Sequence, residues 1–203
     1  VGRPETAWVR LAAMSQLGTC LSAVDHHEDA LRVKEAMLST LRRIGASEEQ
    51  MLIVQNNLAN TYHELGRLEE TSRILGDVYS GHCRLSGDGE ASLASAYNYA
   101  NTLIALERFE EAKALMRKTM PVAQRVLGES HQLTLRMRGV YAVAFYEDPA
   151  ATLDDLREAV TTLEDAKRIA RRVLGGAHPI TTMAERDLRN ARAALRARET
   201  PPP

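Results

Sequence analysis

The sequence contains few of the residues that favour β-strands or disulfide frameworks. Only 4% of its 203 residues are aromatic, and alanine and leucine outnumber the β-branched residues, so the composition favours helix. The two cysteines, Cys20 and Cys83, are too few for a disulfide framework, and neither lies in a Cys-x-x-Cys pair. A single disulfide bond between them is one interpretation, but two reduced thiols in a cytoplasmic protein are the simpler one.

The sequence also lacks an excess of one charge and any long apolar run. The net charge is −1, whereas nucleic-acid-binding proteins usually carry a clear basic excess. No apolar run approaches the ~20 residues that a membrane-spanning helix needs. We therefore expect neither nucleic acid nor a membrane as a partner.

An internal repeat is visible along the chain. Leu58–Thr61 reads Leu-Ala-Asn-Thr, and Tyr99–Thr102 reads Tyr-Ala-Asn-Thr. We call the alignment of Leu58 with Tyr99 the repeat register. The same register aligns Glu69-Glu70 with Glu110-Glu111, and Leu17–Cys20 is a weaker copy of the first motif. Self-similarity at a fixed period of about 40 residues is the mark of a repeat architecture.

A second repeated motif marks the last copy of the repeat. Val126–His131 returns as Val173–His178, a longer spacing that gives the fourth copy about six extra residues. We place part of this excess at Glu147–Thr152, around Pro149, and the rest in the helix that follows.

Each copy is predicted to form two helices, because its apolar residues recur at helical spacing. The acidic pairs suit the positive end of each second helix, and Gly128 and Gly175 suit the left-handed position after a helix. Pro121 predicts a kink inside the sixth helix, whereas Pro179 suits a helix start. The predicted helices span residues 5–24, 28–44, 48–65, 68–85, 90–106, 109–127, 131–147, 152–174 and 178–198.

Three short motifs connect these repeats with a known family. They are Asn56–Tyr62 (Asn-Asn-Leu-Ala-x-x-Tyr), the Gly-Arg-x-Glu-Glu pattern of Gly66–Thr71 and Arg108–Ala112, and Leu174–Thr181 (Leu-Gly-x-x-His-Pro-x-Thr). These motifs resemble the tetratricopeptide repeat (TPR), in particular the longer variety of the kinesin light chains. The resemblance covers residues 10–195; it is strong in the two middle copies and weak in the first, where His27 replaces an aromatic residue.

The resemblance implies an all-α fold, a right-handed α-solenoid of about four TPR hairpins with a C-terminal capping helix. Its first helices would line a concave groove that binds peptides. The expected TPR domain is residues 5–198, with repeats at about 5–46, 47–87, 88–128 and 129–175, a capping helix at 178–198 and a proline-rich tail at 199–203.

Helical geometry predicts which side chains face that groove, if Leu58, Ala59 and Tyr62 pack inward. Asparagine amides can pair with both edges of an extended peptide, and a tyrosine offers a rigid amphipathic surface. Arginines can hold carboxylates, which favours an acidic peptide. The alternative for the asparagines is that they cap or bridge adjacent repeats. The candidate peptide-binding residues are Asn56, Asn60, His63, Tyr97, Asn101, Arg136, Arg186 and Asn190.

Other clusters are interpreted as structural. His26–Asp29 has no second ligand pair spaced to complete a metal site, so we expect a solvated helix start there and neither metal nor cofactor. The arginines between Arg168 and Arg198 are interspersed with acidic residues and lack aromatic stacking partners, which indicates a solvated face. No catalytic motif occurs in the sequence.

The function predicted from these observations is a non-enzymatic scaffold or adaptor that binds an extended peptide of a protein partner. We expect a monomer or a weak homo-oligomer. Two alternatives stay open. The repeats are a regulatory or sensor segment of a larger signalling protein or enzyme, or they form a structural subunit of an assembly.

Overall fold

Helices make up the regular secondary structure of the residues described here. The computed structural model describes residues 4–200, with side chains from residue 8 onward, so the Pro201–Pro203 end of the predicted tail lies outside them. Every bound lies within one residue of its predicted position. The helices are α1 (Pro4–Ala23), α2 (His27–Arg43), α3 (Glu48–Glu64), α4 (Leu68–Ser86), α5 (Glu90–Ala105), α6 (Phe109–Leu127), α7 (Gln132–Tyr146), α8 (Leu153–Leu174) and α9 (Pro179–Glu199).

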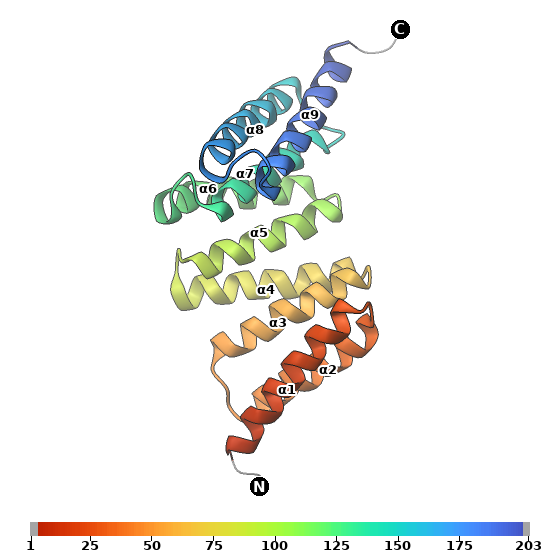
Figure 1. Ribbon diagram of the computed structural model, residues 1–203. Helices are drawn as coiled ribbons and strands as arrows, with labels where there is room; N and C mark the ends of the chain where they lie inside the picture. The colour runs from red at the N-terminus through yellow and green to blue at the C-terminus, as the bar shows by residue number, and fades with distance from the viewer. Residues whose placement is uncertain (1–3, 201–203) are drawn as a thin grey trace. The chain divides into compact units, whose positions relative to one another are not determined.

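The chain divides into two compact units, which we describe separately. The N-terminal unit, Val1–Gly87, contains α1 to α4, and each helix packs against the next one in the chain (Figure 1). The C-terminal unit, Asp88–Pro203, contains α5 to α9. Its consecutive helices also pack together, and its first helices contact one another, α5 with α7 and α7 with α9. Both units are therefore stacks of antiparallel helical hairpins, in agreement with the predicted all-α repeat fold.

Small residues allow the helices to approach closely, because they place little side-chain bulk between neighbouring backbones. Ala59, Ala100 and Ala142 are completely buried, and Gly18 is buried at the corresponding place in the first repeat. Larger side chains form core clusters between the helices: Leu103 packs with Ala112 and Ala144, and Leu135 packs with Ile169 and Ile180.

Side-chain caps fix where several helices begin. Ser47 with Gln50, and Thr152 with Asp155, form capping boxes that satisfy free backbone N–H groups at the starts of α3 and α8. The histidine of the Leu-Gly-x-x-His motif has the same role: His178 Nδ1 accepts a hydrogen bond from the Ile180 N–H at 3.2 Å. The motif histidine thus acts at a helix start.

The tight turn within each of the first three hairpins uses a left-handed backbone conformation. Asp25, Gly66 and Glu107 have φ angles of 60°, 72° and 57°, and they occupy the same place in the repeat register. Glycine adopts this region without steric strain, whereas aspartate and glutamate do so at a cost. The same turn is therefore least strained in the second repeat.

The glycines that end α6 and α8 differ in detail from the prediction. Gly128 and Gly175 have positive φ angles of 90° and 88°, as expected, but their ψ angles of 159° and 163° are not those of a left-handed helical residue. The chain extends away immediately, because it must soon start the next helix at His131 or His178. Helix α6 continues through Pro121, and the predicted kink stays a prediction.

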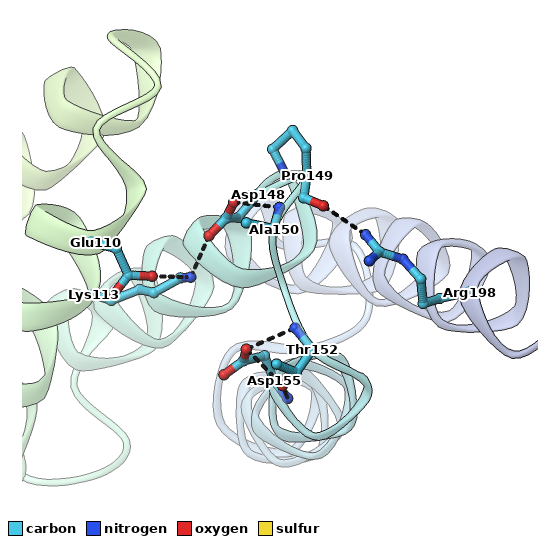
Figure 2. Close-up of polar contacts among 8 residues, drawn as sticks. All are labelled: Glu110, Lys113, Asp148, Pro149, Ala150, Thr152, Asp155 and Arg198. Atoms are coloured by element: carbon cyan, nitrogen blue, oxygen red, sulfur yellow. Dashed lines mark hydrogen bonds and ion pairs between the residues drawn. The ribbon is translucent and has the colours of Figure 1, made fainter.

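The extra residues of the fourth repeat form a braced loop. Residues 147–152 separate α7 from α8, and α8 has 22 residues where α6 has 19. Figure 2 shows Asp148 between the Lys113 ammonium, at 2.5 Å, and the Ala150 N–H, at 2.8 Å. Arg198 of α9 donates to the Pro149 carbonyl at 2.8 Å. The insertion is thus attached to both α6 and α9.

Candidate partner-binding surface

In the N-terminal unit, the candidate residues lie on α3. Asn60 and His63 are exposed and Asn56 is half-buried, whereas Ala59 and Thr61 on the adjoining face are at most 1% exposed. The helix therefore separates a packing face from a polar face, as helical periodicity predicts. Neither Asn60 nor His63 makes a side-chain hydrogen bond among residues 8–200, so both are available to a partner.

Two clefts adjoin this polar face. One, of about 470 Å³, is lined mostly by polar residues, among them Thr19, Ser22, Lys34, Asn57 and Asn60, and we call it the polar cleft. The other, of about 280 Å³, is almost wholly apolar and is lined by residues that include Trp8, Leu11, Met37, Ile53 and Val54. Both clefts lie between α1, α2 and α3, and they follow one another along α1 and α3. The N-terminal unit therefore offers a polar and an apolar recess on the same helices.

In the C-terminal unit, Tyr97 and Asn101 lie on α5. The Asn101 amide donates to the carbonyl of Tyr97 at 2.7 Å, so one of its two donors is already bound to its own helix. Its oxygen and second N–H stay available for a ligand. Tyr97 is half-buried and Asn101 is exposed.

Arg136 lines a separate cleft of about 660 Å³ at the start of α7. The same cleft is lined by Glu90, Ala94 and His131, and the His131 Nε2 lies 4.0 Å from a Glu90 carboxylate oxygen. Arg136 is exposed and has no ion pair among the described residues. An arginine with this exposure can still take a carboxylate from outside.

Arg186 and Asn190 on α9 lie together with the end of α7. Arg186 Nε donates to the buried carboxylate of Asp187 at 2.9 Å, and a side-chain hydrogen bond joins Asn190 and Tyr146. Burial and the charge of Asp187 raise the pKa of Tyr146 to about 12, and the same two causes raise the pKa of Glu147. Arg186 is thus partly committed to an internal carboxylate, so it is a weaker candidate than Arg136.

The clusters that we interpreted as structural have local partners. His27 Nε2 lies 3.5 Å from Asp25, and His26 Nδ1 lies 3.7 Å from Asp29. No group of three potential metal-ligating side chains occurs in the part of the chain described here. Of the arginines between Arg168 and Arg198, several pair with carboxylates, for example Arg192 with Glu164 at 2.5 Å.

Two further features bear on the environment of the chain. Cys20 and Cys83 are both free thiols. Within residues 4–200, no helix combines the length and the apolarity that crossing a bilayer requires.

Sequence reasoning missed Lys34. Its ammonium donates to Ser22 Oγ at 3.0 Å and to Thr61 Oγ1 at 2.6 Å, in the wall of the polar cleft. A signal for it was present in the sequence, since the repeat register aligns Lys34 with the apolar residues Leu75 and Met116.

Comparisons with known proteins identify the repeats. Two family models described as tetratricopeptide repeat match residues 52–89 and 92–148. The comparison with curated proteins gives no match.

Solved structures share the fold over most of the chain. The nearly identical TPR-like repeats assigned to a kinesin light chain of Podosopora anserina align with a TM-score of 0.76 at 22% identity, covering 94% of this chain and 89% of that one. A variant of the same protein gives a TM-score of 0.79, also at 22% identity, covering 94% of this chain and 88% of that one. BtubC (BKLC) from P. vanneervenii gives 0.63 at 14% identity, covering 94% and 81%. Identities this low show a shared fold only.

Proposed function

This chain is a tetratricopeptide-repeat protein with a helical-repeat solenoid fold like that of kinesin light chain repeats, and we propose that it is a non-catalytic scaffold that binds an extended peptide segment of a protein partner. Repeats of this kind serve as protein-interaction scaffolds. The finer proposal is that the segment lies along the first helices of the repeats.

One observation carries this proposal. Two of the first helices, α3 and α5, each expose an asparagine amide beside a completely buried alanine, and on α5 the half-buried Tyr97 and Ile104 lie on the same stripe as the amide. On α3 and α5, Ala59 and Ala100 are fully buried while the next residues, Asn60 and Asn101, are exposed. An exposed amide offers both a donor and an acceptor, so each of these asparagines can pair with the N–H and C=O groups of an extended chain.

The remaining features of the proposal follow from charge and exposure. Arg136, exposed in its cleft, favours an acidic residue in the bound segment. Several of the basic residues near the C-terminus are paired with carboxylates, which argues against a nucleic-acid partner. Two free thiols fit a reducing, cytoplasmic environment. We further propose a monomer or a weak homo-oligomer.

The test is a selection followed by a double substitution. A library of random twelve-residue peptides is displayed and selected against the full 203-residue chain, and the enriched peptides are synthesised. The change Asn60→Ala with Asn101→Ala is expected to weaken their binding about tenfold, because two peptide hydrogen bonds are lost. Helical content and Tm should stay at the unsubstituted values, since both side chains are exposed.

The control uses exposed residues of the second helices. The exposed Arg73 and Lys118 lie on α4 and α6, and changing both to Ala should leave binding unchanged. Equal loss from both double variants, or full binding by the asparagine variant, would contradict the proposed site. It would favour a structural or regulatory role through another face.

A further inference from the structure

Helix α1 carries an apolar stripe on an exposed side of the N-terminal unit. The α1 stripe consists of five side chains at intervals of three or four residues: Val9, Ala13, Leu17, Cys20 and Val24. Val24 directly follows the helix, and its N–H still donates to the Cys20 carbonyl at 3.2 Å. At 3.6 residues per turn the five positions fall within about 80° of the helix circumference, so they share one face. All five side chains are exposed, and the exposed fractions of Val9, Leu17 and Val24 are 72%, 50% and 62%.

The α1 stripe faces away from the hairpin to which α1 belongs. Leu11 and Gly18, which are buried, lie about 150° around the helix from the middle of the stripe. A Cβ on Gly18 would lie 3.3 Å from Lys34 Cγ, so this opposite side is the one that packs against α2. The five stripe residues line neither the polar cleft nor the apolar cleft. The stripe is therefore a surface separate from the candidate peptide-binding residues of α3.

The first helix of the second hairpin has a corresponding stripe, and there it is covered. Leu17 aligns in the repeat register with Leu58 of α3, which is 5% exposed. Cys20 aligns with Thr61, which is 1% exposed. Helix α2 packs against α3 on this side, and the Lys34 ammonium donates to the Thr61 hydroxyl at 2.6 Å. A stripe at this place in the repeat thus lies under another helix, and an aligned row of exposed apolar side chains marks a contact surface.

The order of the side chains makes the α1 stripe complementary to itself. From either end it reads large, small, large, small, large, with Leu17 in the middle. Two α1 helices that lie antiparallel, with a two-fold axis at Leu17, place Val9 of each copy opposite Val24 of the other. The same arrangement places Ala13 opposite Cys20, so that small residues meet and the two backbones can approach. A two-fold interface requires such self-complementarity, because the same surface serves both copies.

The charges at the ends of the α1 stripe are complementary as well. Arg10 and Asp25 are both exposed, and the sequence between them contains no charged residue. Arg10 lies at the first end of the stripe and Asp25 at the second end. The antiparallel arrangement therefore brings Arg10 of each copy to Asp25 of the other, whereas a parallel arrangement would place like charges together.

We propose that the α1 stripe is the interface of a weak homodimer, in which the α1 helices of two copies pack antiparallel around Leu17. The proposal goes beyond peptide binding and rests on the weak homo-oligomer of the proposed function, to which it assigns a surface. Because the contact is a single helix pair about 22 Å long, it covers less than the ~800 Å² per partner of a standard interface. We therefore expect a Kd on the order of 100 µM.

Sedimentation velocity of the full 203-residue chain, under reducing conditions and from about 10 µM to about 1 mM, tests the dimer. Two matched variants are measured beside the wild type. Leu17→Glu places two like charges at the two-fold axis. Leu85→Glu makes the same substitution on α4 of the same unit, at a side chain that is 47% exposed against 50% for Leu17. Both leucines are exposed, so helical content and Tm should stay at the unsubstituted values.

The wild type and Leu85→Glu should shift from monomer towards dimer over this range, and Leu17→Glu should dimerise about tenfold more weakly or not at all. A wild type that stays monomeric at about 1 mM would overturn the dimer and leave the stripe to a different partner. Equal association of Leu17→Glu and the wild type would also overturn it. Peptides selected for the proposed function should bind Leu17→Glu and the wild type equally. If no peptide binds while the dimer forms, the peptide-binding function fails and the dimer stands.

Cysteine cross-linking tests the antiparallel geometry separately. In a background with Cys20→Ala and Cys83→Ala, Leu17→Cys should form a disulfide between copies on mild oxidation, because this position faces itself across the axis. Ala13→Cys in the same background should not, since the two copies of this position lie about 10 Å apart along the helices. Equal cross-linking at both positions, or none for Leu17→Cys at concentrations where the chain is dimeric, would overturn the antiparallel arrangement.

Discussion

Each unit of this chain holds one lysine whose ammonium is hydrogen-bonded inside the fold, and the two lysines differ in what surrounds their charge. Lys113 of the C-terminal unit is 2% exposed and contacts two carboxylates, Glu110 at 2.8 Å and Asp148 at 2.5 Å. Lys34 of the N-terminal unit is half-buried and contacts two neutral hydroxyls. The first charge is neutralised within the fold, whereas the second has no carboxylate partner among the described residues.

The pKa directions express the same difference. Burial acts to lower the pKa of Lys113, but its hydrogen bonds to Asp148 and Glu110 outweigh burial and raise it overall. Burial alone lowers the pKa of Lys34. A paired buried cation connects structural elements, here α6 and the loop after α7. A partly buried cation without a counter-charge lowers the stability of the fold, because its charged form is desolvated without compensation.

The largest expected effect is that of Lys113→Met. It leaves the carboxylate of Asp148, which is 9% exposed, buried without its cation. Removing one partner of such a pair typically lowers the free energy of unfolding by about 3 kcal/mol. Urea unfolding followed by far-UV circular dichroism measures this. The control Glu110→Gln removes the 78%-exposed partner and should change the stability by about 0.5 kcal/mol or less. A loss below about 1 kcal/mol for Lys113→Met would show that the loop is not held by this pair.

The same substitution in the other unit should have the opposite sign. Lys34→Met replaces an uncompensated, half-buried ammonium with an apolar side chain in a position that is apolar in the other hairpins. We expect the free energy of unfolding to rise by about 1 kcal/mol. Trp8 is the only tryptophan and lies in the N-terminal unit, so its fluorescence reports this unfolding. Arg32→Met should stay within about 0.5 kcal/mol of the wild type. Destabilisation by Lys34→Met would mean that its hydroxyl contacts outweigh its burial.

The pH dependence sharpens the comparison. The folded-state pKa of Lys34 lies below the ordinary value of 10.5. The charged ammonium therefore destabilises the folded state fully at neutral pH. This destabilisation declines as the pH rises through the folded-state pKa towards 10.5, because the ammonium loses its proton. The stability difference between Lys34→Met and the wild type should therefore shrink between pH 7 and pH 10.5.

Lys113 supplies the reference for this measurement. Its folded-state pKa is raised, so its stabilising effect is fully present below 10.5 and is lost only at higher pH. The difference between the wild type and Lys113→Met should stay constant over the same interval. Parallel behaviour of the two variants would remove the distinction between the two lysines.

The smallest expected effect concerns the strained turn of the third hairpin. Glu107 has a φ angle of 57°, and the second hairpin has a glycine, Gly66, at the same place of the turn. Glu107→Gly should therefore raise the free energy of unfolding by about 0.5 kcal/mol, because glycine adopts this backbone conformation without strain. Thermal unfolding of the variant and the wild type measures the gain. Glu107→Ala is the control; it removes the same side chain without easing the left-handed backbone, so it should give no increase. An equal gain from alanine would assign the effect to the charge of Glu107.

Sequence reasoning reached the helices more easily than the site. The repeat register, the acidic pairs at the starts of α4 and α6 and the glycines after α6 and α8 are local signals, so the helix bounds follow from them. The stripe with Asn60, Asn101 and Arg136 was also predictable as an exposed face, because helical periodicity separates it from the buried alanines. The sequence did not show that Asn101 is bound to its own helix or that Arg186 is committed to Asp187, since these contacts depend on rotamers.

The amino-acid sequence by itself determined that this protein is a series of helical hairpins, because propensity, capping and apolar spacing act within a few turns of chain. Only the tertiary structure decided which groups surround the ammonium groups of Lys34 and Lys113. Lys113 forms an ion pair with Asp148, on the loop after α7, whereas the Lys34 ammonium donates to the hydroxyls of Ser22 and Thr61. The charge that surrounds a side chain depends on which distant segments pack against it, and a local pattern does not contain that information.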